Sequence, residues 1–420
     1  MTEKVYSIIE VSEQDGKWEY SDINFSAAPM VDSPGSTAGS GAPTTGSPGS
    51  GAGPVWRETS PMAVAGSGLA AAGSQEDDRR VFYQDLSGSV VETVYEPSLP
   101  DGRWVGYHVF TTEISAPSAG VGSALAVAGR LGDLRVYYFD GGRRLVRLEE
   151  RGQKWTYAVC ADAPRGLPIS PLTALVTERG EYAYYLDGAG HLVEVSWLGV
   201  EGWSVSEVTA GVEGCPVPST LSRLTAAGYG TGMRLVHFLD ERNHPIQLEH
   251  AVIAGTKKDP EGGALWQARD LAGYGAPAVA AGSQPAVELT ADGHPRLHYL
   301  DADRMVVEVG FNGRGWEVNH VGADADDGAG APAAAAGSSL ATVAQADRAA
   351  TRVYYLGAAD CSDDPRLGDN QLIELRGAGD KWTSRDLGAE LGLPDVATGV
   401  PSPFAAICTI GPRVYYTSEE

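Results

Sequence analysis

The chain has 420 residues, of which 43% are hydrophobic, and it carries a formal net charge of −24. A surface this acidic repels phosphate groups, so nucleic acids and anionic membranes are not expected partners. The sequence contains no run of 18 apolar residues that could insert into a membrane. The four cysteines, Cys160, Cys215, Cys361 and Cys408, form no Cys-x-x-Cys pair, so they predict neither a zinc site nor a disulfide framework.

The first part of the chain divides into two short expected strands and a linker. Residues 1–25 hold a strand at 5–10 and a second strand led by Trp18. They lack the apolar stretch of a secretory signal, so we expect a cytoplasmic protein or one exported by an unconventional route. Residues 26–60 are rich in Gly, Pro and Ser and cannot bury a core, which predicts a flexible tether. Residues 61–420 form the body of the expected domain.

A strand-like aromatic run recurs along the rest of the chain. Its copies are Arg80–Asp85, Arg135–Asp140, Tyr182–Asp187, Leu235–Asp240, Arg296–Asp301, Arg352–Gly357 and Arg413–Ser418. The average period is about 55 residues, which suits a four-stranded blade with generous loops. In each complete copy a strand of small residues precedes the run, and a turn, a third strand and a Trp-led fourth strand follow it. One such run would also fit a sandwich hairpin, but seven aligned runs predict an all-β propeller.

The two ends of the chain each supply half of a blade. The C-terminal part provides a first strand near residue 405 and a second strand at Arg413–Ser418. The N-terminal part provides only a third and a fourth strand. Pairing these halves closes the ring and removes its exposed edges. We therefore predict seven blades, the last one split between the termini, with six blades as the alternative.

An arginine at the head of the second strand and a glutamate in the third strand recur together. The four pairs are Arg80 with Glu92, Arg296 with Glu308, Arg352 with Glu374 and Arg413 with Glu10. Arginine offers a fixed fork of donors, glutamate accepts from hydroxyl groups, and an indole offers a flat apolar wall, so the set suits a sugar. The alternative is structural, with a cross-strand ion pair and a tryptophan that fills the gap between blades.

The order Arg-Val-Tyr-Tyr/Phe-x-Asp, a turn, Val/Ile-x-Glu and Lys/Gly-Trp resembles the repeat of the fungal fucose-specific lectins and of related bacterial propeller lectins. The resemblance covers nearly the whole chain except the predicted tether. It implies fucose sites between neighbouring blades, where Arg and Glu of one blade bind ring hydroxyls and aromatic residues of the next blade pack on the apolar side of the sugar. It implies no metal and no other cofactor. The best-known fungal members have six blades, and some bacterial relatives have seven.

Carried over to this chain, the resemblance implies four sugar-binding sites. They comprise Arg80 and Glu92 with Trp155, Arg296 and Glu308 with Trp382, Arg352 and Glu374 with Trp18, and Arg413 and Glu10 with Trp104 and Tyr95.

Three further clefts depart from this pattern, and we expect weak or no fucose binding there. Arg147 stands at the glutamate position of the Arg135 copy. Tyr182 replaces the arginine that would pair with Glu194, and Leu235 and Gln247 replace both residues in the last case.

Motifs of common enzyme classes are missing from the sequence. It has no Ser-x-Asp-x-Gly-x-Thr-Trp box, Gly-x-Ser-x-Gly elbow, His-Glu-x-x-His pair or Walker loop. An arginine partner holds a carboxylate such as Glu308 ionised, which suits an acceptor better than a general acid. His237 and His298 share one slot in the second strand, where packing is the favoured role.

We therefore predict a multivalent, metal-independent lectin for fucosylated glycans or glycoproteins, without catalytic residues and with a homodimer left open. Two alternatives remain. One is a lectin-like propeller recruited as a cyclase for pericyclic steps of the Diels–Alderase type in specialised metabolism, and the other is a protein-binding scaffold.

Overall fold

A computed structural model describes residues 5–14, 17–23, 61–64, 66–74, 77–98, 103–152, 154–199, 202–229, 232–253, 263–328, 330–344, 350–358, 370–378, 381–393, 405–408 and 412–419. The predicted tether at 26–60 lies outside these residues.

The chain folds into seven antiparallel sheets, which we call blades I to VII. In the lists that follow, the strands of each blade run from the innermost to the outermost. Blade I contains β4 (Ala70–Gly73), β5 (Arg79–Gln84), β6 (Val90–Glu96) and β7 (Arg103–Val109). Blade II contains β8 (Ala126–Arg130), β9 (Asp133–Phe139), β10 (Leu145–Arg151) and β11 (Lys154–Val159). Blade III contains β12 (Leu172–Thr177), β13 (Gly180–Leu186), β14 (Leu192–Trp197) and β15 (Trp203–Glu207).

The remaining blades have the same order. Blade IV contains β16 (Thr225–Tyr229), β17 (Met233–Leu239), β18 (Pro245–Ile253) and β19 (Gly263–Asp270). Blade V contains β20 (Ala286–Leu289), β21 (Pro295–Leu300), β22 (Val306–Phe311) and β23 (Trp316–Asn319). Blade VI contains β24 (Ala341–Ala344), β25 (Ala350–Ala358), β26 (Asn370–Ala378) and β27 (Lys381–Asp386). Blade VII contains β28 (Ala405–Cys408), β29 (Pro412–Glu419), β1 (Val5–Gln14) and β2 (Lys17–Asp22).

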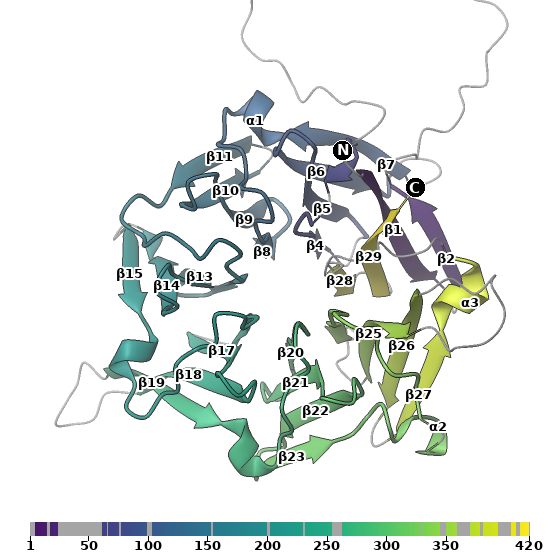
Figure 1. The fold of residues 1–420 in the computed structure, drawn as a ribbon. Helices are drawn as coiled ribbons and strands as arrows, with labels where there is room; N and C mark the ends of the chain where they lie inside the picture. Colours follow the sequence, from purple (N-terminus) through teal and green to yellow (C-terminus); the bar gives the residue numbers. More distant parts are fainter. Residues whose placement is uncertain are drawn as a thin grey trace, which may run out of the picture.

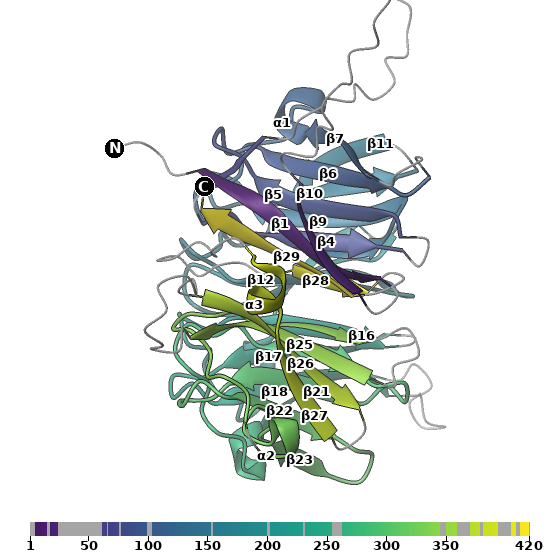
Figure 2. The same ribbon diagram turned by 90° about the vertical axis from the view of Figure 1, so that its right-hand side faces the viewer.

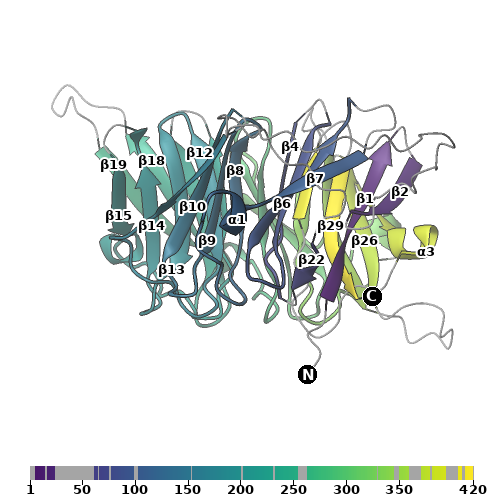
Figure 3. The ribbon, with the colours of Figure 1, turned by 90° about the horizontal axis from the view of Figure 1, so that it is seen from above.

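The blades stand around a central axis as a propeller (Figure 1). Their innermost strands contact one another in the cyclic order β4, β8, β12, β16, β20, β24, β28 and back to β4. Seen edge-on, the blades form a disc with loops on its two faces (Figure 3). The all-β, seven-bladed prediction is therefore confirmed.

Blade VII joins the two ends of the described chain. β1 pairs with β29, and Ile9 lies opposite Tyr416 in this register. The purple β1 and the yellow β29 lie side by side (Figure 2). A short strand, β3 (Ala63–Val64), adds to the same sheet by pairing with β1. Closure by a split blade is therefore as the sequence predicts.

The aspartate that ends the aromatic run builds a turn. Five blades use it, at Asp85, Asp140, Asp187, Asp240 and Asp301, and it is replaced by Gly357 in blade VI. In blade IV, Oδ1 of Asp240 accepts hydrogen bonds from the backbone N–H groups of Arg242 and His244, both at 2.8 Å. The position after Arg242 has a positive φ and holds Asn243 (61°), a residue that tolerates the left-handed region. The repeated Asp thus fixes the hairpin between second and third strands.

The second aromatic residue of the run ties its blade to the loop before it. Among the described residues, its hydroxyl donates to a proline carbonyl in the pairs Tyr83–Pro61, Tyr138–Pro117, Tyr185–Pro164, Tyr299–Pro277 and Tyr355–Pro332, at 2.5–3.0 Å. These tyrosines are buried. A buried Tyr must satisfy its O–H, and this bond does so. Packing therefore explains this aromatic position without a ligand.

Helical segments are few and short among the described residues. They are α1 (Phe110–Glu113), α2 (Ala325–Gly328), α3 (Leu387–Leu391), η2 (Thr209–Gly211) and η3 (Leu271–Tyr274). In the part of the chain that the structure describes, no helix has the length and apolar character needed to cross a membrane.

Candidate functional site

The clefts between neighbouring blades are built by strand alternation. Successive side chains of a strand point to opposite faces, so in each second strand one residue faces the following blade and the residue before it faces the preceding blade. The arginine of the repeat faces forward, toward the third-strand glutamate of its own blade and the aromatic side chains of the next blade. We name each cleft by its two blades, such as V/VI.

In the V/VI cleft a sequence-predicted arginine is open to solvent. The Arg296 side chain is 40% exposed, and its Nη1 lies 3.7 Å from Oε2 of Glu308. His298 Nε2 donates to Glu308 Oε2 at 3.2 Å, and Asn319 Nδ2 donates to Oε1 at 3.0 Å. Trp382 of blade VI lies across the cleft, and its ring centroid is 6.1 Å from that of His298. The structure thus brings Arg296, Glu308 and Trp382 to one cleft.

The Glu308 carboxylate of this cleft is held ionised. Burial raises its pKa, but the hydrogen bond and charge of His298, the charge of Arg296 and the hydrogen bond of Asn319 outweigh burial and lower the pKa to about 2. His298, for which the sequence favours a packing role, therefore also orients the carboxylate. Sequence reasoning missed this function, although the signal was present because His298 lies directly opposite Glu308 in the strand register.

The VI/VII cleft holds a second predicted trio, but in a closed arrangement. Arg352 Nη1 lies 2.7 Å from Glu374 Oε1, and the guanidinium carbon is 5.9 Å from the ring centroid of Trp18. Arg352 Nη2 also pairs with Glu13 of blade VII at 2.7 Å. Only 3% of the Arg352 side chain and 4% of the Glu374 side chain are exposed. Glu13 thus takes the donors that a sugar would need.

In the VII/I cleft a different arginine fills the space. Arg79, the residue before the repeat arginine of blade I, forms an ion pair with Glu10 and lies 3.3 Å over the ring of Tyr95. Trp104 donates its indole N–H to Glu10 Oε2 at 3.2 Å. The predicted partner Arg413 is 4.0 Å from Glu10 and instead pairs with an aspartate of blade I at 3.1 Å. The predicted residues gather here, but around Arg79.

The I/II cleft is closed in a third way. Arg80 Nη1 lies 3.1 Å from Glu92 Oε1, and the Glu92 side chain has no exposed surface. Trp155 packs edge-on against Phe82 and Phe110, with ring centroids 6.0 and 4.9 Å away. Burial is the main cause that raises the pKa of Glu92, to about 7. The carboxyl group is sealed inside the blade.

Ion pairs between the two blades also fill the II/III cleft. Arg147 occupies the glutamate position of blade II, and Glu181 of blade III occupies the same slot that Arg79 has in blade I. Arg147 Nη2 lies 2.6 Å from Glu181 Oε2, and Arg135 Nε lies 2.6 Å from Glu181 Oε1. The signs are reversed relative to the VII/I cleft, but the two strand positions are the same.

The III/IV cleft repeats the Arg79 arrangement. Arg234 Nη2 lies 3.3 Å from Glu194 Oε2, and the guanidinium carbon is 3.9 Å from the ring of Tyr182 and 5.4 Å from that of Trp266. Sequence reasoning missed this slot in all three clefts. The available signal was a charged residue directly before the aromatic run, opposite in sign to the third-strand residue of the preceding blade, because such a pair can close the cleft between the two blades. In the other four clefts the slot holds Leu134, Pro295, Thr351 or Pro412, none of which is charged.

The IV/V cleft lacks both repeat residues and contains a cavity of about 210 Å³. Leu235, Gln247, Phe311 and Trp316 are among the residues that line it. The Gln247 side chain bonds to His237 at 3.0 Å. Among the described residues, no group of three or more His, Cys, Asp or Glu side chains is placed to hold a metal ion.

Comparison with known proteins identifies structural neighbours only. No family model matches the chain, and no curated protein matches it. A fungal lectin from Aleuria aurantia, described as a six-bladed β-propeller with a fucose recognition mode, is 16% identical, with a TM-score of 0.50 over 77% of this chain and 96% of that one. A variant of that lectin in complex with Fucα1-6GlcNAc is 17% identical, with the same coverage and TM-score. AofleA from Arthrobotrys oligospora is 16% identical, with a TM-score of 0.48 over 76% of this chain and 86% of that one. At these identities the likeness establishes a shared propeller fold, and this chain has one blade more than the six described for the Aleuria lectin.

Proposed function

We propose that the protein is a carbohydrate-binding lectin that takes fucose or a fucosylated glycan in the V/VI cleft. The observation that carries the proposal is the 40% exposure of the Arg296 side chain beside the ionised Glu308, with Trp382 on the facing blade. The likeness to propellers described as fucose lectins favours this sugar, and the repeat of this chain points the same way.

The chemistry of the cleft suits vicinal hydroxyl groups. The 3.7 Å separation between Arg296 and Glu308 is longer than a hydrogen bond, so the guanidinium keeps donors for a ligand. Glu308 accepts one bond on each oxygen and retains further lone pairs. The half-buried indole of Trp382 offers an apolar wall for the C–H face or the methyl group of the sugar.

This assignment changes the expected valency of a single chain. In the VI/VII, VII/I and I/II clefts the predicted arginine side chains are only 3%, 3% and 17% exposed. We propose one principal site per chain. Agglutination then requires a second copy of the chain or opening of a second cleft, and multivalent binding follows from either.

A second candidate function is a lectin-like propeller used as a cyclase. The observation that favours it is the 210 Å³ cavity in the IV/V cleft, which lacks the repeat Arg and Glu. Leucine, methionine, phenylalanine and tryptophan side chains contribute to its wall, together with Glu249, Arg269 and His294. A pericyclic reaction needs a shaped apolar pocket more than it needs acid and base groups. This reading predicts no response to sugars.

The deciding experiment is a glycan array followed by titration calorimetry with methyl α-L-fucoside. We expect signals on fucosylated glycans and about one site per chain, with at least about tenfold weaker binding in Arg296→Ala, because both hydrogen bonds of the fork are lost. Arg314→Ala, at an exposed turn of blade V, is the matched control and should bind as the wild type does. Silence toward every fucosylated structure would reject the lectin and leave the cyclase candidate. Binding that Arg296→Ala leaves intact would move the site out of the V/VI cleft.

A further inference from the structure

The mouth of the central channel is built by a serine that repeats from blade to blade. In five blades the serine hydroxyl accepts a backbone N–H from the second strand at 2.7–3.0 Å, at Ser67, Ser123, Ser170, Ser222 and Ser338. This bond fixes the start of each innermost strand. The residue after each serine therefore reaches the rim of the channel, and these rim residues are Gly68, Ala124, Pro171, Arg223, Gln284 (after Ser283) and Ser339.

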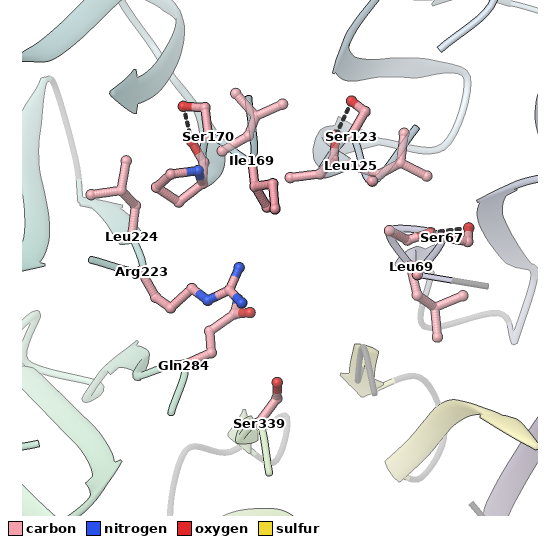
Figure 4. Close-up of a pocket in the computed structure, with 16 residues that line it drawn as sticks. Ser67, Leu69, Ser123, Leu125, Ile169, Ser170, Arg223, Leu224, Gln284 and Ser339 are labelled. Carbon is pink, nitrogen blue, oxygen red and sulfur yellow. Dashed lines mark hydrogen bonds between the residues drawn. The ribbon is translucent and has the colours of Figure 1, made fainter. Parts of the chain in front are cut away.

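The rim encloses a cavity of about 280 Å³. Figure 4 shows Arg223 extending from blade IV into this space, beside Gln284 of blade V. Leu69, Leu125 and Ile169 lie on the other sides of the same cavity (Figure 4). The size is close to the lower end for pockets that hold small ligands. The site combines one cationic group with an apolar wall.

Among the described residues, Arg223 differs from the buried arginines of the clefts in having no counter-charge. Within the described ranges, the Arg223 guanidinium forms no ion pair and no side-chain hydrogen bond, whereas Arg79, Arg147, Arg234 and Arg352 each contact a glutamate. Arg223 is the one charged side chain among the described residues that line the cavity. Its partial burial lowers its pKa, because no carboxylate offsets the loss of hydration. An uncompensated charge in a cavity is costly, and an anionic ligand would remove that cost.

We propose that the channel mouth binds a small amphipathic carboxylate. The carboxylate would take the guanidinium fork of Arg223, with the Gln284 amide as a further donor. The hydrocarbon part would lie against Leu69, Leu125 and Ile169. A single cation in a largely apolar lining suits a monoanion with a tail better than a free phosphate dianion, and the net charge of −24 opposes polyanions. The site is separate from the V/VI cleft and requires no sugar.

Titration of the full chain with octanoate tests the proposal, with 1-octanol and inorganic phosphate as comparison probes. We expect saturable binding of octanoate to the wild type and to the control Arg314→Gln, and at least about tenfold weaker binding to Arg223→Gln. Octanol should bind more weakly than octanoate and equally to all three proteins, and phosphate should neither bind nor compete.

Two further measurements separate this site from the lectin site and from a folding defect. Ile169→Ser changes a side chain that is 68% exposed, so the fold should persist while octanoate binding weakens. Methyl α-L-fucoside should bind Arg223→Gln as it binds the wild type, so failure of one site leaves the other measurable. Octanoate binding that is equal in the wild type and Arg223→Gln, absent octanoate binding, or phosphate binding that depends on Arg223 would overturn the proposal.

Discussion

Glu92 and Glu308 occupy the same position in blades I and V, and the structure predicts opposite pH effects when each is replaced by glutamine. Glu92 is fully buried and its Oε2 has no hydrogen-bond partner. Its position opposite Phe82 explains this, since the corresponding residue in blade V, His298, supplies a bond to Glu308. Burial raises the pKa of Glu92 from 4.5 to about 7, offset in part by the charges of Arg80 and His108.

The sign of the pH dependence at Glu92 follows from the raised pKa of its carboxyl group, which stays protonated in the folded protein to a higher pH. Because the pKa is higher in the folded state, the folded protein binds the proton more tightly, and stability is lost as pH rises from about 4.5 to about 7. The difference between these pKa values corresponds to about 3 kcal/mol of unfolding free energy. Glu92→Gln keeps the shape of the protonated group and should not suffer this loss. The variant should therefore gain up to about 3 kcal/mol over the wild type between pH 4 and pH 8.

Urea unfolding of both proteins at several pH values between 4 and 8 measures this gain, and the comparison cancels groups that titrate in both. Glu308→Gln, compared with the wild type from about pH 5 down to about pH 2, is the matched control with the opposite sign. Its pKa of about 2 means that the carboxylate stabilises the fold above pH 4.5, and that this contribution disappears as pH falls toward 2. The reasoning is refuted if the stability difference between Glu92→Gln and the wild type is constant with pH, or if it shrinks as pH rises.

Two other predictions concern the ion pairs of the clefts. Arg352→Ala should destabilise the protein by about 3–5 kcal/mol in urea unfolding, because it leaves the buried Glu374 without a cationic partner. Arg296→Ala, in the open cleft, should cost no more than about 1 kcal/mol. Equal losses in the two variants would contradict the distinction between closed and open clefts. Arg147→Glu and Glu181→Arg should each lower the melting temperature strongly. The double variant should recover part of the loss by forming the pair with reversed signs, but not all of it, because the arginine at position 181 then faces Arg135. A double variant no more stable than the two single changes combined would show that these side chains do not interact.

The sequence predicted the fold well because its signals are local and repeated. The aspartate of the hairpin turn and the tyrosine that bonds to a proline carbonyl both act within one blade or its preceding loop. Their spacing along the chain therefore indicates where each blade begins and how its strands follow one another. The match between the two terminal halves then required a seventh, shared blade. Each predicted arginine and glutamate pair also lies within one blade, and the structure places Arg80 near Glu92, Arg296 near Glu308 and Arg352 near Glu374.

The state of each cleft could not be predicted in the same way, because it depends on contacts between blades. Arg79 meets Glu10 although the two are far apart in sequence, and it does so from the face opposite to that of Arg80. Glu13 reaches Arg352 from the other end of the chain. Whether a guanidinium is open or sealed is decided by such side chains. Their effect on the sugar-binding roles of the predicted residues stays a prediction until binding is measured.

The split blade also affects the order in which the protein can be made. Blades I to VI each consist of consecutive segments, so the strands that pair within one blade are made one after another. Of the described strands, β1 and β2 are synthesised before the others, whereas their main partner, β29, is synthesised after them. The pairing of Val5 with Val64 and of Tyr6 with Ala63 gives β1 an early partner in β3. This short strand can hold β1 beside blade I while the edge of β1 that pairs with β29 stays available, so the ring is completed when β28 and β29 are made.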